Sequence, residues 1–364
     1  MNTTNIKIER DEELWEVIVK AEITPEGLAT YRTEVLANLQ KTAKLDGFRP
    51  GHVPSDRLVS TYGEPAIMRL AAERAIEREL PEILVKESVM IIESPKVTTD
   101  SPVFGEVLAF TARAPMAPRV TLPDYKKIMV GQGEAKEIAP VLDSEVADAL
   151  THIRRERVRI DKIEGGMDQT KASEESRAID SANLPELDDA FAISIGYESR
   201  EKFEGALRTN MQTEKEMQAS QKRRGTLLDE LVKQSTIHYP KVLREYELDD
   251  LQAQFIEDLK RSSVTIEQYL KDTKKTPETL RTDFEKGADM RVKIRLVLSE
   301  IGRIEHIEPS DEVIDHELTH AIERYPKSDP QALRANITHA LRNEMTIRFL
   351  EGNTEVVGHT GHDH

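Results

Sequence analysis

One short string in the sequence has the residue types and the spacing of an enzyme site. Residues 316–320 read His-Glu-Leu-Thr-His, which matches the H-E-x-x-H motif, where two histidines one helical turn apart hold zinc and the glutamate acts as a base. The apolar face of the same predicted helix is marked by Ile314, Leu318, Ala321, Ile322 and Tyr325. At 100° per residue both histidines point away from that face. An exposed helix is therefore favoured, and a zinc metallopeptidase is the remote alternative.

Nothing else in the chain completes a catalytic or cofactor site. The residues that would extend the zinc motif are absent, since Glu323 and Pro326 stand where glycine and histidine are needed. Glu344 could act as a third ligand, but nothing marks it for that role. Gly131-Gln132-Gly133 lacks the third glycine of a dinucleotide-binding motif and is interpreted as a turn. We therefore expect no catalytic residue, no metal site and no cofactor.

Composition excludes further classes of chemistry. The chain has no cysteine, which rules out disulfides, cysteine-ligated zinc, iron–sulfur clusters and thiol catalysis. Its 51 basic and 67 acidic side chains give a net charge of −16, so non-specific binding of nucleic acid by the whole molecule is not expected. The basic cluster at 222–224 is flanked by acidic residues and is interpreted as a solvated helix face. Residues 351–364, with His359, His362 and His364, are expected to form a disordered tail.

A second candidate for function is a loop. Residues 47–54 read Gly-Phe-Arg-Pro-Gly-His-Val-Pro, and two glycines and two prolines in eight positions cannot continue a helix. Residues 41–60 carry four basic and two acidic side chains, although the whole chain is acidic. Arg49 can pair with a phosphate or a carboxylate, and Phe48 offers an apolar anchor or a stacking face. The alternative is an ordinary tight loop in which Phe48 turns into the core.

The elements before this loop would position it. Residues 5–8 and 14–23 are rich in Ile and Val with an acidic turn between them, which predicts a β-hairpin. Thr24 is a suitable N-cap and Pro25 a suitable first helical residue. Apolar residues at helical spacing then predict one amphipathic helix to about Lys44.

After the loop, helix is expected over residues 55–87 with breaks at Pro65 and Pro81, and strands over 89–92 and 105–114. Prolines 115, 118 and 123 then indicate a linker, which continues into a strand-like run at 127–130 and a helix over 141–160. Residues 161–183 are polar and without periodicity, so they are interpreted as a loop. Helices are expected over residues 199–234, 241–261, 266–272, 277–302, 310–324 and 330–350.

These elements predict an elongated, multidomain α+β protein. A small α/β N-terminal domain would be followed by an all-α C-terminal domain with helical arms, and a length of 364 residues allows two or three domains at roughly 150 residues each. The expected boundaries are 1–117, 118–183 for the linker strand, helix and loop, 184–350, and 351–364 for the tail. No apolar run reaches the ~20 residues of a membrane helix, and the acidic start does not fit a secretory signal, so a cytoplasmic location is expected.

With these elements around it, the loop at 47–54 resembles the ribosome-docking loop of trigger factor, a family of bacterial chaperones that receive nascent chains. Residues 118–160 are similar to the linker and the following helix of that family, and Leu-Pro-Glu-Leu-Asp at 184–188 begins a region similar to its helical chaperone domain. The resemblance covers roughly residues 1–160 and 184–350. It implies a ribosome-binding site formed by Gly47, Phe48, Arg49, Pro50, Gly51, His52, Val53 and Pro54.

The sequence departs from the family's pattern at two places. His52 stands where the docking loop usually has lysine, so one docking charge depends on pH. The family also inserts an FKBP-like prolyl isomerase domain between the linker helix and the chaperone domain, and a domain of that kind needs on the order of 100 residues. Only residues 161–183 are available here, so we expect the isomerase domain to be missing.

The resemblance implies an ATP-independent chaperone that docks at the ribosomal exit and holds nascent or unfolded polypeptides, without enzymatic activity. Its partners would be a large-subunit protein and rRNA at the exit site and unfolded chains, with no membrane and a possible homodimer when free. A ribosome-independent holdase or assembly factor is the alternative. The predicted helical domain has more length than core-forming residues, so some apolar side chains are expected at its surface, and the candidates for client contact are Met211, Met217, Phe255 and Leu259.

Overall fold

The computed structural model describes residues 2–43, 45, 48, 51–132 and 138–352. Packing of the Cα atoms divides the chain into two compact units. The first joins Met1–Pro123 to Val232–Asn343, and the second joins Asp124–Leu231 to Glu344–His364. Each unit is therefore built from segments that are far apart in the sequence.

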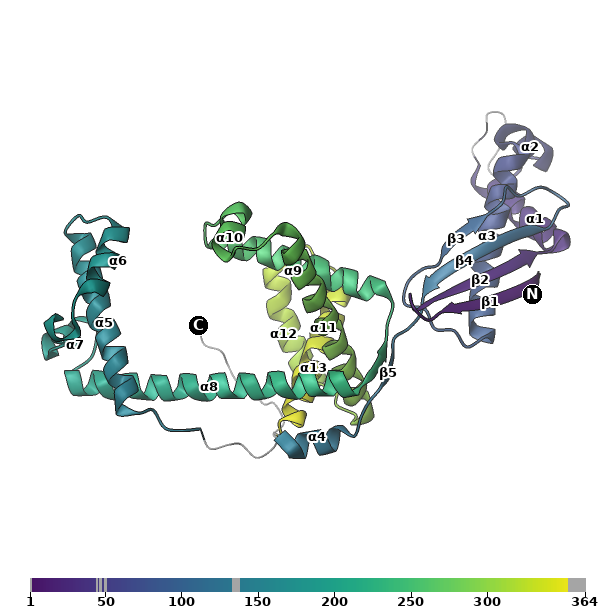
Figure 1. Cartoon of the computed structure of the whole chain (residues 1–364). Coiled ribbons are helices and arrows are strands. Elements are labelled where there is room, and N and C mark those ends of the chain that lie inside the picture. The colour runs from purple at the N-terminus through teal and green to yellow at the C-terminus, as the bar shows by residue number, and fades with distance from the viewer. Residues whose placement is uncertain (1, 44, 46–47, 49–50, 133–137, 353–364) are drawn as a thin grey trace. The chain divides into compact units, whose positions relative to one another are not determined.

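The first unit begins with an antiparallel sheet in the order β1-β2-β4-β3 (Figure 1). Strands β1 (Thr3–Asp11) and β2 (Glu16–Ile23) form the predicted hairpin, and β4 (Leu108–Pro115) pairs with β2 along its whole length. Side chains alternate across β2 and β4, so that one face of each strand is buried. The buried residues are Val17, Val19, Ala21, Ile23, Leu108, Phe110, Ala112 and Ala114.

Three helices follow the hairpin, and two of them cover the buried face of the sheet. They are α1 (Pro25–Thr42), α2 (Ser55–Tyr62) and α3 (Glu64–Lys86). The predicted cap of α1 is confirmed, since the Thr24 hydroxyl accepts a hydrogen bond from the Gly27 amide at 3.1 Å. Leu28 and Tyr31 of α1 and Ile67, Ala71 and Ile83 of α3 are in the same buried cluster as the sheet residues.

One charged side chain lies inside this core. Glu79 of α3 is only 3% exposed and accepts hydrogen bonds from the backbone and side-chain nitrogens of Asn2 and from the Tyr31 hydroxyl. Burial and the bond to Glu79 raise the pKa of Tyr31. The network ties the start of the chain to α1 and α3 and satisfies a carboxylate that would otherwise be costly to bury.

Several predicted boundaries in the first unit are wrong. Helix α3 continues through Pro81, because the flanking Leu80 and Ile83 are buried and their packing outweighs one lost backbone hydrogen bond. The strand expected at 89–92 is reduced to a single bridge between Ile91 and Met116. A short edge strand, β3 (Lys96–Thr99), pairs with β4 instead, and all four of its residues are exposed, so no hydrophobic pattern marked it.

The linker differs from its prediction as well. The strand-like run at 127–130 is part of helix α4 (Tyr125–Gln132), because the Asp124 carboxylate and carbonyl accept hydrogen bonds from the Lys127 amide and begin the helix. Gly131 and Gln132, interpreted as part of a turn, end this helix, and Gly133 lies outside the described residues. The linker strand is β5 (Arg119–Thr121), which pairs with β6 (Thr236–His238) more than 100 residues later.

The rest of the first unit is helical, as predicted. Helix α9 (Lys241–Arg261) packs along α11 (Pro277–Ile304), and α10 (Ile266–Thr273) lies at the end of this pair (Figure 1). Helix α12 (Asp311–Arg324) begins at the cap formed by Ser310. Buried residues concentrate on α11: Ala288, Val292, Val297, Leu298, Ile301 and Gly302.

The second unit contains α5 (Asp143–Glu164), most of the 35-residue α8 (Arg200–Gln234) and the end of α13 (Pro330–Leu350). The prediction of a loop at 161–183 is wrong. The Asp168 carboxylate caps a helix there, α6 (Gln169–Ala178), and Ala172 and Ser176 bury its inner face against α5. A 3₁₀ turn (Ser181–Asn183) and the short α7 (Asp189–Ser194) complete the connection.

A small apolar cluster holds this connection together. Leu187, Ala192 and Phe203 are buried, and Phe191 and Tyr197 pack edge-on against Phe203 at 6.1 and 5.3 Å between ring centroids. On α5, Arg154 donates hydrogen bonds to the Leu184 and Pro185 carbonyls, and Arg157 lies 4.9 Å from the centroid of the Phe191 ring. No helix in the described parts of the chain has the length and apolar run needed to cross a membrane.

Candidate functional site

The candidate docking loop joins α1 to α2, and its second half is fastened to Gln40 of α1. The Gly51 amide donates to the Gln40 carbonyl at 2.9 Å, and the Gln40 side-chain nitrogen donates to the Val53 carbonyl at 3.0 Å. Gly51 has a φ of +89°, a conformation that residues with a Cβ rarely adopt. Gly47, Arg49 and Pro50, which were predicted to belong to this site, lie outside the described residues.

The described side chains of the loop divide into inward and outward groups. Val53 is fully buried beside Leu58 of α2, so its side chain can hold the loop in place but cannot itself contact a partner. Phe48 is 37% exposed and lies at the surface, which rules out the alternative of a phenylalanine turned into the core. His52 and Pro54 are exposed as well.

Ion pairs between α1 and α3 brace the frame around this loop. Arg32 donates two hydrogen bonds to Glu64, at 2.6 and 2.8 Å, and Arg74 and Arg78 both pair with Glu34. The hydrogen bond from Arg32 lowers the pKa of Glu64, and burial opposes this shift. Helix α1, which carries the start of the loop, is therefore fixed to α3 by electrostatics at the surface as well as by the core.

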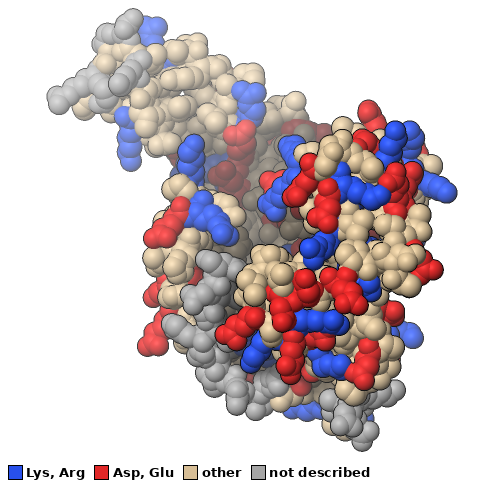
Figure 2. Space-filling model, turned by 90° about the vertical axis from the view of Figure 1, so that its left-hand side faces the viewer, with Lys and Arg blue, Asp and Glu red and all other residues tan. Residues whose placement is uncertain are grey.

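Figure 2 shows one face of the molecule, and on it basic and acidic side chains are intermingled. Arg224 of the cluster at 222–224 pairs with Glu351 at 2.8 Å within the second unit. Basic side chains that are paired or interspersed with acidic ones make a poor nucleic-acid surface. This placement agrees with the interpretation of the cluster as a solvated helix face.

The histidines of the H-E-x-x-H string face water, as predicted. The side chains of His316 and His320 on α12 are 54% and 64% exposed, and their ring centroids are 4.8 Å apart. Among the described residues, no group of three or more His, Cys, Asp or Glu side chains could hold a metal ion. The predicted apolar face is only partly correct, since Ile314 is buried but Ile322 and Tyr325 are 39% and 55% exposed.

The four candidate client contacts differ in their surroundings. Met217 of α8 is 57% exposed, and Met211, earlier on the same helix, is half-buried. Phe255 of α9 packs edge-on against Tyr269 and Phe284, at 4.9 and 5.3 Å between ring centroids. Leu259 is half-buried. Met217 is therefore directly available to a partner, whereas Phe255 belongs to an aromatic cluster.

Sequence reasoning missed an apolar groove between α9, α10 and α11. The groove has a volume of about 430 Å³ and is lined by Leu248, Asp249, Gln252, Ile266, Leu270, Pro277, Leu280, Arg281 and Phe284. Ile266, at the start of α10, is 45% exposed. The sequence predicts a helix over 266–272, but the pattern of one helix does not show which neighbouring helices form a groove with it.

Together, an α/β domain with an outward loop and a helical region with exposed apolar groups define a multidomain binding protein. Comparisons with known proteins agree. A model of the bacterial trigger factor protein matches residues 4–153, and a model of the bacterial trigger factor C-terminus matches residues 199–352. No match to an FKBP-type domain was found between residues 153 and 199. The chain belongs to the trigger factor family of protein-folding chaperones.

Relatives match most of this chain at low identity. The trigger factor of Listeria monocytogenes serotype 4b (strain CLIP80459) is 23% identical over 91% of this chain and 93% of its own length. The trigger factor of Bacillus subtilis (strain 168) is 23% identical over 92% and 95%. A solved structure described as "Promiscuous Substrate Recognition in Folding and Assembly Activities of the Trigger Factor Chaperone" covers 97% of this chain and 100% of that chain at 15% identity, with a TM-score of 0.49.

Proposed function

We propose that this trigger factor docks on the ribosome through residues 47–54 and holds nascent or unfolded polypeptides on its helical region, without ATP and without prolyl isomerase activity. The exposure of Phe48 beside the buried Val53 carries the proposal. An exposed aromatic side chain can enter a pocket on a partner and act as an anchor there. Arg49, next to it in sequence, would add a charge-assisted contact to rRNA or to an acidic side chain.

Client holding would use many weak apolar contacts. The groove between α9, α10 and α11 and the exposed Met217 offer such contacts on different helices. Methionine adapts to different partners, and isolated apolar groups bind weakly enough to release a chain quickly. Binding of this kind needs neither a cofactor nor a metal. Membership of the trigger factor family also supports a cytoplasmic location. A homodimer in the free state stays a prediction.

The proposed lack of isomerase activity is supported by what stands between α5 and α8. That segment folds into α6, a 3₁₀ turn and α7, and its aromatic residues Phe191 and Tyr197 pack on Phe203 of α8. An isomerase of this type needs an open, aromatic-lined pocket for the X-Pro bond. These rings instead fill a small core.

Co-sedimentation with ribosomes tests the docking proposal. The double variant Phe48→Ala/Arg49→Ala should lose most binding, because removal of a central aromatic anchor and of a charge-assisted bond each costs on the order of 2 kcal/mol. The matched control is Val85→Ala/Arg69→Ala, which removes an exposed apolar side chain and an exposed arginine elsewhere in the same domain. Equal sedimentation of the wild type and the loop variant would contradict the proposal.

The second candidate function, a ribosome-independent holdase, is favoured by His52 in place of the usual lysine. Histidine is positively charged only at mildly acidic pH, whereas lysine is charged throughout the neutral range. If His52 contributes to docking, sedimentation should increase between pH ~7.5 and ~6, and His52→Lys should remove that dependence. A wild type that does not sediment at either pH, while it still prevents client aggregation, would favour the ribosome-independent function.

A further inference from the structure

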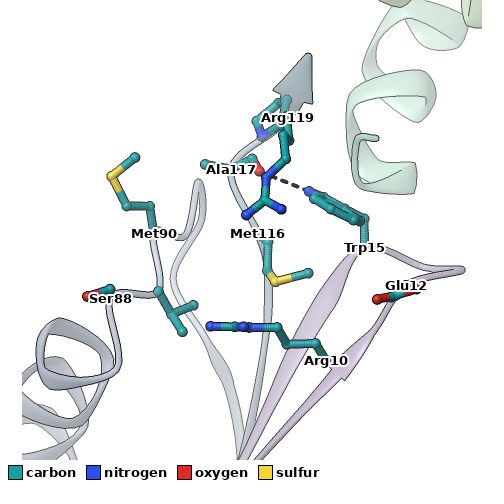
Figure 3. Close-up of a pocket in the computed structure, with 10 residues that line it drawn as sticks. Arg10, Glu12, Trp15, Ser88, Met90, Met116, Ala117 and Arg119 are labelled. Carbon is teal, nitrogen blue, oxygen red and sulfur yellow. Dashed lines mark hydrogen bonds between the residues drawn. The ribbon is translucent and has the colours of Figure 1, made fainter. Parts of the chain in front are cut away.

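Trp15, the only tryptophan of the chain, occupies a strained position at the end of the β1–β2 turn. Its φ is +55°, a left-handed conformation that bulky residues adopt only when their surroundings hold them there. The ring nitrogen donates to the Ala117 carbonyl at 2.9 Å, and the Trp15 carbonyl accepts from the Met116 amide at 3.0 Å (Figure 3). The strained turn is thus bound to the chain just before the linker strand β5.

The faces of the Trp15 ring are contacted by the linker sheet. His238 of β6 stacks on the ring with 4.7 Å between centroids and 16° between planes, and the Arg119 guanidinium of β5 lies 5.9 Å from the centroid. Arg119 and His238 are themselves paired across β5 and β6. As a result Trp15 is only 9% exposed, although it stands at a hairpin turn.

Charges around this stack are complementary. A cavity of about 490 Å³ is lined on one side by the turn residues Glu12 and Glu13, both exposed. The basic side chains on the other side come from α9 and α11: Lys241, Arg244 and Lys293. Lys241 pairs with Glu245, and Lys293 pairs with Asp289. Asp289 also accepts a hydrogen bond from the Tyr239 hydroxyl. No ion pair of Arg244 occurs among the described residues. The acidic turn therefore faces a net basic surface.

We propose that Trp15 and His238 form a latch that fastens the β5–β6 linker sheet to the β1–β2 turn, and that the acidic turn makes this latch sensitive to salt. When the latch is closed, the linker sheet is held against the α/β domain. When it opens, the chain at 117–119 and the exposed hydrogen bond from the Tyr246 hydroxyl of α9 to Glu93 are what join them, and the α/β domain can turn relative to β6 and α9 once that hydrogen bond also breaks. The latch is independent of whether the loop at 47–54 binds ribosomes.

Trp15 emission in the full chain tests the latch directly, because no other tryptophan contributes. In the wild type, raising NaCl from ~0.05 to ~1 M shortens the screening length from above 10 Å to about 3 Å and weakens the attraction that keeps the latch closed. Trp15 emission should therefore shift to longer wavelength, and its quenching by acrylamide should increase. His238→Ala should show the open-state emission already at low salt, with the ratio of closed to open molecules reduced roughly 2- to 10-fold, the range expected for one aromatic pair. His238→Phe, which can stack, should restore the wild-type emission at low salt.

Charge variants test the electrostatic part. In Glu12→Gln/Glu13→Gln, Trp15 emission should change less with salt than in the wild type. The control is Glu73→Gln/Glu77→Gln, which changes two exposed glutamates of α3, and its emission should change with salt as in the wild type. Far-ultraviolet circular dichroism checks that each variant folds, and the Ala117 hydrogen bond of Trp15 is untouched in all of them. The latch is refuted if His238→Ala has wild-type emission and quenching at low salt, or if both glutamine double variants respond to salt equally.

Discussion

At the scale of single residues, the pair between Arg32 and Glu64 governs how the frame of the candidate docking loop depends on pH. Glu64 has a folded-state pKa below its usual value because Arg32 donates two hydrogen bonds to it. A lowered carboxylate pKa stabilises the fold above the unfolded-state pKa, near 4.5, and this stability is lost as pH falls through the folded-state pKa. The side chain of Glu64 is 36% exposed, so solvent screening keeps the contribution small.

We therefore expect Glu64→Gln to lower the free energy of unfolding by roughly 0.5–1 kcal/mol at pH 7 and to have a progressively smaller effect as pH falls below 4.5. Urea unfolding of the α/β domain, followed by Trp15 fluorescence at several pH values, measures this difference. Glu73→Gln, an exposed glutamate on the same helix, serves as the control and should match the wild type throughout. A difference that persists unchanged at low pH would show that packing, rather than the ion pair, is responsible.

At the scale of elements, most of the fold could be predicted wherever local signals and tertiary packing agree. The Thr24 cap, the alternation in β2 and the ends of α9 and α13 follow directly from capping and periodicity. The run at 127–130 shows the opposite case, since its β-branched residues favour a strand but the Asp124 cap begins a helix. Propensity is weaker than a satisfied helix terminus in so short a segment.

The pairing of strands far apart in the sequence could not be predicted, because it depends on tertiary contacts rather than on local signals. Strands β5 and β6 have three residues each, too few for a periodic signal, and they exist because Arg119–Thr121 and Thr236–His238 meet in space. The candidate loop was found from its glycines, prolines and charges, whereas the buried position of Val53 depends on the core beneath it. The apolar groove between α9, α10 and α11 needs three helices at once, and one helical pattern cannot reveal it.

The connection between α5 and α8 leads to an element-scale prediction. Because α6 packs on α5 and α7 belongs to a closed apolar cluster, the purified chain should not accelerate cis/trans exchange of an X-Pro peptide. The uncatalysed reaction takes tens to hundreds of seconds at 25 °C, so even modest catalysis would be visible in a protease-coupled assay. A full-length trigger factor that contains an FKBP-type domain provides the positive control, and a comparable rate from this chain would contradict the prediction.

At the scale of the whole molecule, the expected activity is the suppression of client aggregation by contacts spread over several helices. Loss of docking should then leave this activity intact, because residues 47–54 belong to the α/β domain and the apolar contacts to the helices. The variant Phe48→Ala/Arg49→Ala should protect a denatured client as well as the wild type does. Protection should need roughly stoichiometric protein and should be unaffected by ATP or by a zinc chelator.

Two single substitutions separate a client contact from a structural role. Met217→Ser removes a side chain that is 57% exposed, so we expect weaker protection of the client and an almost unchanged melting temperature. Phe255→Ser disrupts the cluster with Tyr269 and Phe284, and it should lower the stability of the α9–α11 region by ~2–4 kcal/mol as well. Light scattering of an aggregating client and thermal unfolding measure the two effects. If Met217→Ser, combined with Ile266→Ser in the groove, leaves protection unchanged, these exposed apolar side chains do not hold the client, and the contacts must lie elsewhere on the chain.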